Sequence, residues 1–185
     1  MQKTSIFWFR RDLRLDDNIG LSEALKSDEK VIPIFIFDRD ILDHLEDQYD
    51  RRVDYIHQAL EKINQELKEF GSSLLTFRGK PLDVFKQLEK DFEIKSVFCN
   101  RDYEPSAIKR DDKVKDFLDS KKIAFFDFKD QVIFEKHEVA KDNGEPYTVY
   151  TPFSKKWKKQ LTELDYASVK IDKIQFQKLP SKKIL

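Results

Sequence analysis

The feature that most constrains the fold of this chain is a regular alternation of two apolar patterns. Five short apolar runs, each ended by charge or a turn, are separated by segments whose apolar residues recur every three or four positions. The runs lie at Ser5–Phe9, Val31–Phe37, Leu74–Phe77, Ser96–Cys99 and Ile123–Phe128. Such runs are typical of buried strands in a parallel sheet, and their spacing suits right-handed crossovers. The pattern predicts an α/β fold with a doubly wound, Rossmann-like, five-stranded parallel sheet that has helices on both faces.

The segments between the runs predict helices. The clearest one follows Asp50, keeps an apolar residue at every third or fourth position and ends at Gly71, where a left-handed residue is favoured. The first helix is expected to start at Asp16 or Asp17, because either carboxylate can cap it. A last helix is expected near the end of the chain, with one apolar face made of Phe153, Trp157, Leu161 and Leu164.

The length of 185 residues suits one well-filled core and is too short for two ordinary domains with linkers. We expect one domain at residues 1–165 and the start of a C-terminal interdomain linker at residues 166–185. The linker has no clear period and mixes lysines with the apolar residues Val169, Ile171, Ile174, Phe176, Leu179 and Ile184. That composition is too apolar for a solvated tail, so we expect this segment to lack its packing partner.

The charges are balanced overall and unevenly distributed. Lys and Arg total 35 and so do Asp and Glu, which gives no global positive field of the kind that attracts nucleic acid. Residues 151–185 nevertheless hold nine lysines against three acidic residues, so they carry +6 and leave −6 on residues 1–150. Such a block either forms a solvated helix and tail or meets a partner or a following domain.

The cysteine count and the first apolar run indicate the cellular setting. Cys99 is the only cysteine, so no internal disulfide is possible and a cytoplasmic, intracellular location is expected. The first run ends at once in Arg10 and Arg11, which makes it too short for a signal-peptide core or a membrane span. We expect a soluble protein that does not bind membranes.

The predicted fold itself indicates where a ligand would bind. In an open parallel sheet, ligands bind outside the carboxyl ends of the strands, at the point where the strand order reverses. With the usual order for five strands, this point falls between the first and fourth strands, where the loops Arg10–Asp16 and Asn100–Pro105 lie. Both loops are crowded with charge. Their charges either pair across the end of the sheet or form a binding site.

Several common kinds of site are excluded by the residues that are present. Four glycines, at positions 20, 71, 79 and 144, form neither a dinucleotide-binding G-x-G-x-x-G motif nor a phosphate-binding P-loop. The three histidines are scattered and have no Cys or His at metal-binding spacing, so we expect no metal site. No Ser or Cys nucleophile stands beside a plausible base, and Cys99 is expected to be a core thiol. We therefore expect no catalytic residue.

Four sequence motifs resemble the opening domain of DNA photolyases and cryptochromes. Residues 7–18, FWFRRDLRLDDN, resemble the family pattern W-[FH]-R-x-D-L-R-L-x-D-N. Matches follow in order at Phe37-Asp38, at residues 100–105 (NRDYEP) and at residues 146–153 (PYTVYTPF), ahead of Trp157. The resemblance extends from residue 4 to about residue 165, so the chain is identified as resembling the N-terminal, antenna-binding α/β domain of this family.

The resemblance implies a role in light harvesting. In the family, a linker leads from this domain to an all-helical domain that binds FAD, which these 185 residues do not include. Photolyases are carbon-carbon lyases that repair UV-induced pyrimidine dimers in DNA, and the damaged DNA binds through the helical domain. The α/β domain holds a second pigment, which passes excitation energy to FAD. We expect a monomeric domain without catalysis of its own, whose partner is that helical domain in the same chain.

The loops bear on which pigment is bound. The folate-binding type of the family has an Asn-Glu pair where this sequence has Ser106 and Ala107. The deazaflavin type resembles this chain in its D-x-E-P loop and in an arginine that corresponds to Arg52. A deazaflavin or flavin is therefore favoured over methenyltetrahydrofolate. The residues expected to bind it are Arg11, Asp12, Phe35, Phe37, Asp38, Arg52, Asp102 and Glu104.

Two alternatives stay open at this point. The domain can belong to a cryptochrome blue-light photoreceptor, because the features that separate cryptochromes from photolyases lie in the helical domain. It can also be a stand-alone α/β sensor of a small ligand, because a fold does not fix a function.

Overall fold

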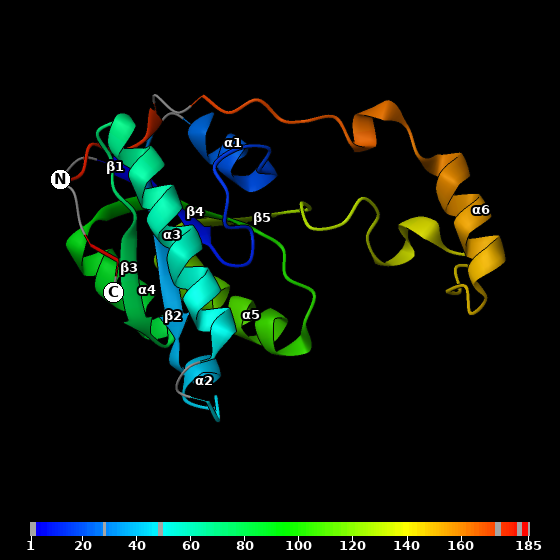
Figure 1. Cartoon of the computed structure of the whole chain (residues 1–185), viewed down its shortest axis with the longest axis horizontal. Coiled ribbons are helices and arrows are strands. Elements are labelled where there is room, and N and C mark those ends of the chain that lie inside the picture. Colours follow the sequence, from blue (N-terminus) through cyan, green and yellow to red (C-terminus); the bar gives the residue numbers. More distant parts are fainter. Residues whose placement is uncertain (1–2, 28, 48–49, 173–174, 181–182, 185) are drawn as a thin grey trace.

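A five-stranded parallel sheet forms the centre of the molecule (Figure 1). The computed structural model describes residues 3–27, 29–47, 50–172, 175–180 and 183–184. The strands are β1 (Lys3–Phe9), β2 (Lys30–Asp38), β3 (Leu75–Gly79), β4 (Glu93–Asn100) and β5 (Ala124–Phe128), in the order β3-β2-β1-β4-β5. All neighbouring pairs are parallel. The predicted fold class and the reversal of strand order between β1 and β4 are confirmed.

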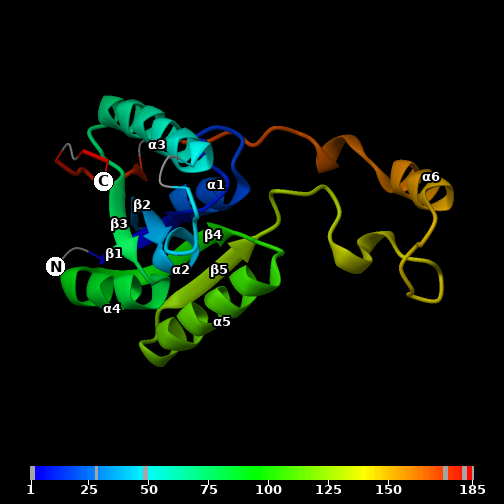
Figure 2. The same ribbon diagram turned by 60° about the horizontal axis from the view of Figure 1, so that its bottom comes forward.

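Helices cover both faces of the sheet, as Figure 2 shows most clearly. The helices α1 (Ile19–Leu25) and α3 (Arg51–Glu69) lie on one face, and α4 (Pro81–Asp91) and α5 (Pro105–Ser120) on the other. A single turn, α2 (Arg39–Leu42), follows β2 directly and has no counterpart in the sequence pattern. None of the helices in the described part of the chain is both long and apolar enough to cross a membrane.

The first strand shows why its apolar run is continuous. Ile6 and Trp8 pack into the core beneath α4 and α5, whereas Phe7 and Phe9 pack into the core beneath α1 and α3. All four side chains are almost completely buried. Burial of a large apolar side chain contributes about 1.5–3 kcal/mol, so a polar residue at any of these positions would weaken one of the two cores.

The first helix begins at Ile19, with its N-cap at Asn18, whereas the sequence predicted a cap at Asp16 or Asp17. Asn18, and neither Asp16 nor Asp17, is its cap, because the Asn18 side chain accepts a hydrogen bond from the Leu21 amide at 3.0 Å. Asp17 has a left-handed backbone conformation with φ of 50°, so the chain turns there and the helix starts after it. Its carboxylate accepts a hydrogen bond from the Val169 amide at 2.9 Å and so holds a distant segment.

Residues 129–168, which we call the arm, project from the sheet and carry α6 (Tyr150–Gln160) at their far end (Figures 1 and 2). The predicted last helix is wrong at its C-terminal end. It ends at Gln160, with Leu161 as its C-cap, and a separate 3-10 turn at Glu163–Asp165 leaves Leu164 87% exposed. The cause is local, because the amide and hydroxyl of Thr162 both donate to the Asp165 carboxylate and form a new cap. Phe153 and Trp157 do pack inward, within the arm.

The C-terminal segment returns to the sheet, so the expectation that it lacks a packing partner is wrong. Phe176 is only 1% exposed and lies in the core beneath α1 and α3. It forms a parallel bridge with Val31, and the Gln177 amide donates to the Val31 carbonyl at 2.7 Å. The Leu179 amide donates to the carbonyl of Gly71, which ends α3 in the expected left-handed conformation. Ile174 lies outside the described residues, and the boundary near residue 165 stays a prediction.

Candidate functional site

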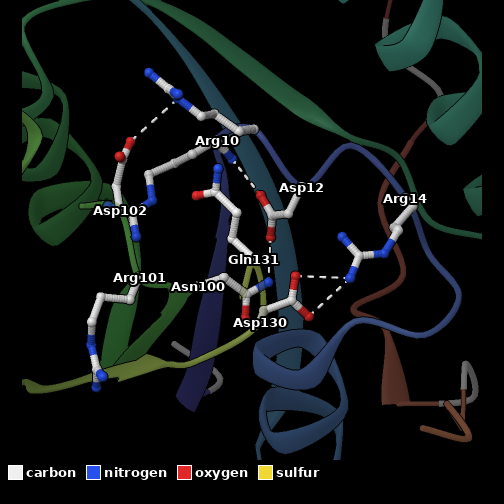
Figure 3. Close-up of a pocket in the computed structure, with 9 residues that line it drawn as sticks. Arg10, Asp12, Arg14, Asn100, Arg101, Asp102, Asp130 and Gln131 are labelled. Atoms are coloured by element: carbon white, nitrogen blue, oxygen red, sulfur yellow. Dashed lines mark hydrogen bonds and ion pairs between the residues drawn. The ribbon is translucent and has the colours of Figure 1, made fainter. Parts of the chain in front are cut away.

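The loops that follow β1 and β4 form a pocket at the carboxyl edge of the sheet (Figure 3). It lies at the predicted reversal of strand order and has a cavity volume of about 120 Å³. Residues that directly follow β5 complete it on the side of the arm. The lining residues are Arg10, Arg11, Asp12, Arg14, Asn100, Arg101, Asp102, Asp130 and Gln131.

Asn100 holds the two main loops of the pocket together. Its amide group donates to the Asp12 carboxylate at 2.6 Å and to the Asn18 side chain at 2.8 Å. Its carbonyl oxygen accepts a hydrogen bond from the Gly20 amide at 2.8 Å. A Cβ atom at Gly20 would lie 2.6 Å from that oxygen, so the close contact between α1 and β4 requires glycine.

Asp12 lines the pocket and also fixes the loop after β1. Besides the bond from Asn100, its carboxylate accepts hydrogen bonds from the Arg10 amide at 2.8 Å and from the Asn18 side chain at 3.2 Å. Three donors around one carboxylate leave it little capacity for a ligand. Asp12 therefore mainly fixes the conformation of the loops that form the pocket.

Arg11 closes one side of the pocket with an ion pair that can open. Its guanidinium contacts Glu104 at 2.6 Å and Asp102 at 3.6 Å. The Arg11 side chain is 55% exposed, whereas that of Asp102 is 9% exposed. Exposed ion pairs contribute only about 0–1 kcal/mol, so the Arg11 side chain can move aside at little cost while Asp102 stays in place.

Two arginines lie over the indole of Trp8, and one of them, Arg10, also lines the pocket. The Arg10 guanidinium lies 5.2 Å from the ring centroid and that of Arg110 lies 5.0 Å from it. Arg10 forms a buried ion pair with Asp111, whose carboxylate also accepts a hydrogen bond from Arg110. This cluster ties the end of β1 to α5 and holds Arg10 where it lines the pocket. Cation–π contacts of this kind strengthen when they are removed from water.

Ion pairs from both loops hold the start of the arm. Arg14 contacts the carboxylate of Asp130 at 2.8 Å, and that carboxylate also accepts the amide of Ile19 at 3.0 Å, at the start of α1. Arg101 contacts Asp127 at 2.9 Å and Glu135 at 2.6 Å. The hydrogen bond from Arg101 lowers the pKa of Asp127 below its ordinary value.

Tyr103 adds a second contact to Glu135. Its hydroxyl donates to the Glu135 carboxylate at 2.5 Å. Burial raises the pKa of Tyr103 well above its ordinary value, and the negative charge of Glu135 raises it further. The phenol therefore stays protonated and keeps its role as a donor across the neutral pH range.

The structure brings together half of the eight residues that the sequence nominated. Arg11, Asp12 and Asp102 line the pocket, and Glu104 stands at its rim in the ion pair with Arg11. The charged residues of the two predicted loops thus converge as expected. Their role in binding a pigment remains a prediction.

The other four nominated residues lie outside the pocket lining. Phe35 is 6% exposed within the core and packs edge-to-face against Phe37 at 4.9 Å. Asp38 caps α2, and burial raises its pKa above the ordinary value. Arg52 is 78% exposed and pairs with Asp50 at 2.5 Å at the start of α3. Phe35 and Phe37, which were expected to form an apolar slot, therefore pack in the core and do not line the pocket.

Sequence reasoning missed Asp130 and Gln131. Both directly follow β5, so the rule that nominated the loops after the first and fourth strands would also have found them.

Cys99 is a buried core thiol, as predicted, and burial raises its pKa to about 12. Within the described ranges, the His, Cys, Asp and Glu side chains form no group of three or more that could hold a metal ion.

Comparison with known protein families gives a clear match. The family model for DNA photolyase matches residues 5–174. A deoxyribodipyrimidine photo-lyase from Synechococcus sp. is 36% identical over 155 residues, which cover 84% of this chain and 32% of the relative. Cryptochrome-1 of Anopheles gambiae is 32% identical over 162 residues, which cover 83% of this chain and 30% of that protein. The chain spans about a third of the length of these curated relatives.

Solved structures agree with the sequence comparisons. A class III photolyase from Agrobacterium tumefaciens superposes with a TM-score of 0.85 at 25% identity, over all of this chain and 37% of that one. An archaeal photolyase from Sulfolobus tokodaii, described as holding two FAD molecules and as implying a novel light-harvesting cofactor, gives 0.67 at 32% identity. That match covers 75% of this chain and 32% of the archaeal one. The chain therefore belongs to the DNA photolyase family and corresponds to the N-terminal α/β domain of its photolyases and cryptochromes.

Proposed function

We propose that this chain is the light-harvesting domain of a deoxyribodipyrimidine photolyase and that its pocket binds an antenna pigment. The observation that carries the proposal is the pocket itself, in which donors and acceptors from three strand ends converge at the reversal of strand order. This is where doubly wound α/β domains bind ligands. The pigment would absorb light and pass the energy to FAD in a helical domain, which carries out the repair of pyrimidine dimers in DNA.

The residues of the pocket suit the polar edge of a flavin or deazaflavin. Such an edge carries carbonyl and N–H groups, for which the Arg11 guanidinium supplies donors and the Asp102 carboxylate an acceptor. The cavity of about 120 Å³ is smaller than the usual 300–1,000 Å³ of ligand pockets, so a three-ring system does not fit inside it entirely. The exposed Arg11 side chain is the part that can move to admit the ring edge.

The start of α5 supports a flavin-like pigment over methenyltetrahydrofolate. Photolyases of the folate type carry an Asn-Glu pair at the positions of Ser106 and Ala107. In this structure Ser106 is exposed and Ala107 is buried in the first turn of α5. Neither side chain supplies the amide or the carboxylate that a pterin would need.

A cryptochrome is the second candidate for the whole protein. The observation in its favour is that Cryptochrome-1 of Anopheles gambiae is about as similar to this chain as several photolyases are. The light-harvesting role of the α/β domain would be the same in both. Repair activity, FAD and contact with damaged DNA through a helical domain are parts of the proposal for the longer protein.

The proposal is tested by titrating the purified chain with FMN, a deazaflavin and methenyltetrahydrofolate while the absorption and fluorescence of each pigment are recorded. We expect saturable binding of FMN or the deazaflavin. The Asp102→Ala variant, which removes the buried acceptor of the pocket, is expected to bind the pigment more weakly by about 1–3 kcal/mol. Asp116→Asn, on the exposed surface of α5, is the matched control and should bind normally.

Two results would count against the proposal. If none of the three pigments binds, the pocket of this chain is not an antenna site by itself. If a pigment binds and Asp102→Ala has the same affinity as the unaltered chain, the pigment lies elsewhere.

A further inference from the structure

Two positively charged guanidinium groups lie against the indole of Trp8. Trp8 is 2% exposed and belongs to the core beneath α4 and α5. The Arg10 guanidinium lies 5.2 Å from the ring centroid and that of Arg110 lies 5.0 Å from it. The other cation–π contacts in the described part of the chain each place a single lysine near a phenylalanine ring, at 5.9 Å. The indole therefore has a more positive environment than those rings.

The positive charge beside Trp8 is not fully neutralised. Arg10 and Arg110 both pair with the carboxylate of Asp111, so these three groups carry one positive charge in excess. The side chains of the two arginines are only 6% and 18% exposed. The Nε and Nη2 atoms of Arg10 are buried and have no hydrogen-bond acceptor among the described residues. A buried charge with unmatched donors costs stability, which points to a role beyond holding β1 on α5.

Trp8 lies close to the pocket in which the pigment is proposed to bind. Arg10 lines that pocket and follows Trp8 by two residues, so about 7 Å separates their backbones. Figure 3 shows Arg10 at the pocket, between Asp12 and Asp102. The indole, in contact with the Arg10 guanidinium, is thus near enough for an electron to pass to a bound pigment.

An oxidisable indole near a photo-excited flavin competes with light harvesting. The excited flavin is a strong oxidant and takes one electron from a nearby indole. The products are a flavin radical anion and an indole radical cation, and the electron then returns to the indole with release of heat. The excitation is lost in this cycle before it can be passed to FAD.

We propose that Arg10 and Arg110 slow electron transfer from Trp8 to the excited pigment and so preserve its excitation. They are positioning residues that act through Trp8, and the inference rests on the proposed function. Loss of an electron would place a positive charge on a ring that already faces two guanidinium groups. The cation–π attraction would become repulsion, which is strong in a buried environment. The oxidised indole is therefore raised in energy and forms more slowly.

The experiment measures the fluorescence lifetime of FMN bound to the full chain, or of the deazaflavin if that is the pigment that binds. In Arg110→Gln, which alters a residue outside the pocket lining, electron transfer should become about tenfold faster, because one charge at about 5 Å is lost. The lifetime should shorten, and transient absorption should detect the indole radical. Arg110→Lys keeps the charge and should retain most of the native lifetime.

Two controls separate the effect on Trp8 from a general loosening of the structure. Lys121→Gln removes a cation–π contact with Phe117 at the other end of α5 and should leave the lifetime unchanged. Trp8→Phe removes the electron donor, so Arg110→Gln should have no further effect on the lifetime in that background. Circular dichroism and urea denaturation verify the fold of each variant. If Trp8→Phe does not fold, the comparison of Arg110→Gln with Arg110→Lys decides.

Three results would overturn this inference while the pigment still binds. The lifetime is unchanged in Arg110→Gln, or Arg110→Gln and Arg110→Lys shorten it equally, or the effect of Arg110→Gln persists in the Trp8→Phe background. In each case the light-harvesting role itself stands. If none of the pigments binds, the proposed function fails and this inference fails with it.

Discussion

At the scale of single residues, the geometry of the pocket depends on a polar contact between two loops that are far apart in the sequence. Asn100 bonds to Asp12, Asn18 and Gly20, which lie 80 or more positions before it in the chain. A buried amide with all these partners is costly to remove, because each partner is left without its hydrogen bond. The same contact explains why position 20 has no side chain.

This contact predicts an energetic coupling between Gly20 and Asn100. Asn100→Ala should lower the free energy of unfolding by about 1–3 kcal/mol through unsatisfied polar groups. Gly20→Ala should cost about 1–3 kcal/mol, because the added Cβ would lie 2.6 Å from the Asn100 side-chain oxygen. In the double variant that oxygen is gone, so the cost of Gly20→Ala should be smaller than in the unaltered chain. A double-mutant cycle by urea denaturation measures it, and strictly additive costs would contradict the contact.

Cys99 gives a prediction about pH. Burial raises its pKa from about 9 to about 12, so the folded protein keeps the thiol protonated where the unfolded chain would already lose the proton. The contribution of this group to stability is therefore complete below the unfolded pKa and is lost as the pH rises from about 9 toward 12. At about pH 8, a thiol reagent should react with the native chain only as fast as it unfolds, and quickly in guanidinium chloride. Rapid reaction of the native chain would contradict the burial.

At the scale of elements, most helices and strands follow local patterns, and the main exception, the segment around Phe176, follows a contact with a distant residue. The helix after Asp50 ends at Gly71 as its period predicts. The segment around Phe176 has no period of its own and is ordered by the sheet, through its bridge to Val31. It adds a buried aromatic ring to the core beneath α1 and α3.

Phe176→Ala should therefore destabilise the α/β domain itself. Removal of a buried phenylalanine costs about 3–5 kcal/mol, from lost apolar burial and from the cavity that remains. Leu164→Ala is the matched control, because that side chain is 87% exposed and should change the free energy of unfolding by less than about 0.5 kcal/mol. Chemical denaturation compares the two. Equal, small effects would mean that the segment is not part of the core.

At the scale of the whole molecule, the pocket and the arm are joined. Arg14 and Arg101, one from each pocket loop, bind Asp130 and Glu135 at the start of the arm, and Asp17 binds Val169 where the arm ends. The arm is thus held at both ends by residues next to the pocket, while its middle projects from the sheet. Its position relative to the sheet depends on a few ion pairs and hydrogen bonds.

Glu135→Gln should loosen the arm and leave the sheet unchanged. The glutamine can still accept a hydrogen bond as a cap, and it removes the negative charge that binds Arg101 and Tyr103. Hydrogen exchange should become faster over Lys136–Val139 and α6, with unchanged protection in β1 and β4. Glu145→Gln, which affects an exposed pair with Lys141 elsewhere in the arm, is the control and should have no such effect. Equal exchange in both variants would contradict this anchoring role.

The sequence alone determined the class of fold, the order of strands at the reversal and the two loops that form most of the pocket. The strands and helices follow from apolar periodicity, which can be recognised within short stretches of sequence. The pocket loops then follow from the general rule that parallel sheets bind ligands at the carboxyl ends of their strands. A twelve-residue motif, at residues 7–18, was enough to indicate the family that the comparisons confirm.

Only the tertiary structure decided the features that depend on residues far apart in the chain. Asn18 caps α1 because Asp17 turns the chain and binds Val169, more than 150 positions away. The C-terminal segment packs because Val31 bonds to it at the start of β2, before the pairing of β2 with β3 begins. Asp130 enters the pocket because Arg14 and Ile19 bind its carboxylate. Four of the nominated ligand residues lie outside the pocket lining because they have other partners. Phe35 and Phe37 pack together, Asp38 caps α2 and Arg52 pairs with Asp50. Periodicity shows which face of an element is buried, whereas the partner of a polar side chain depends on how the whole chain folds.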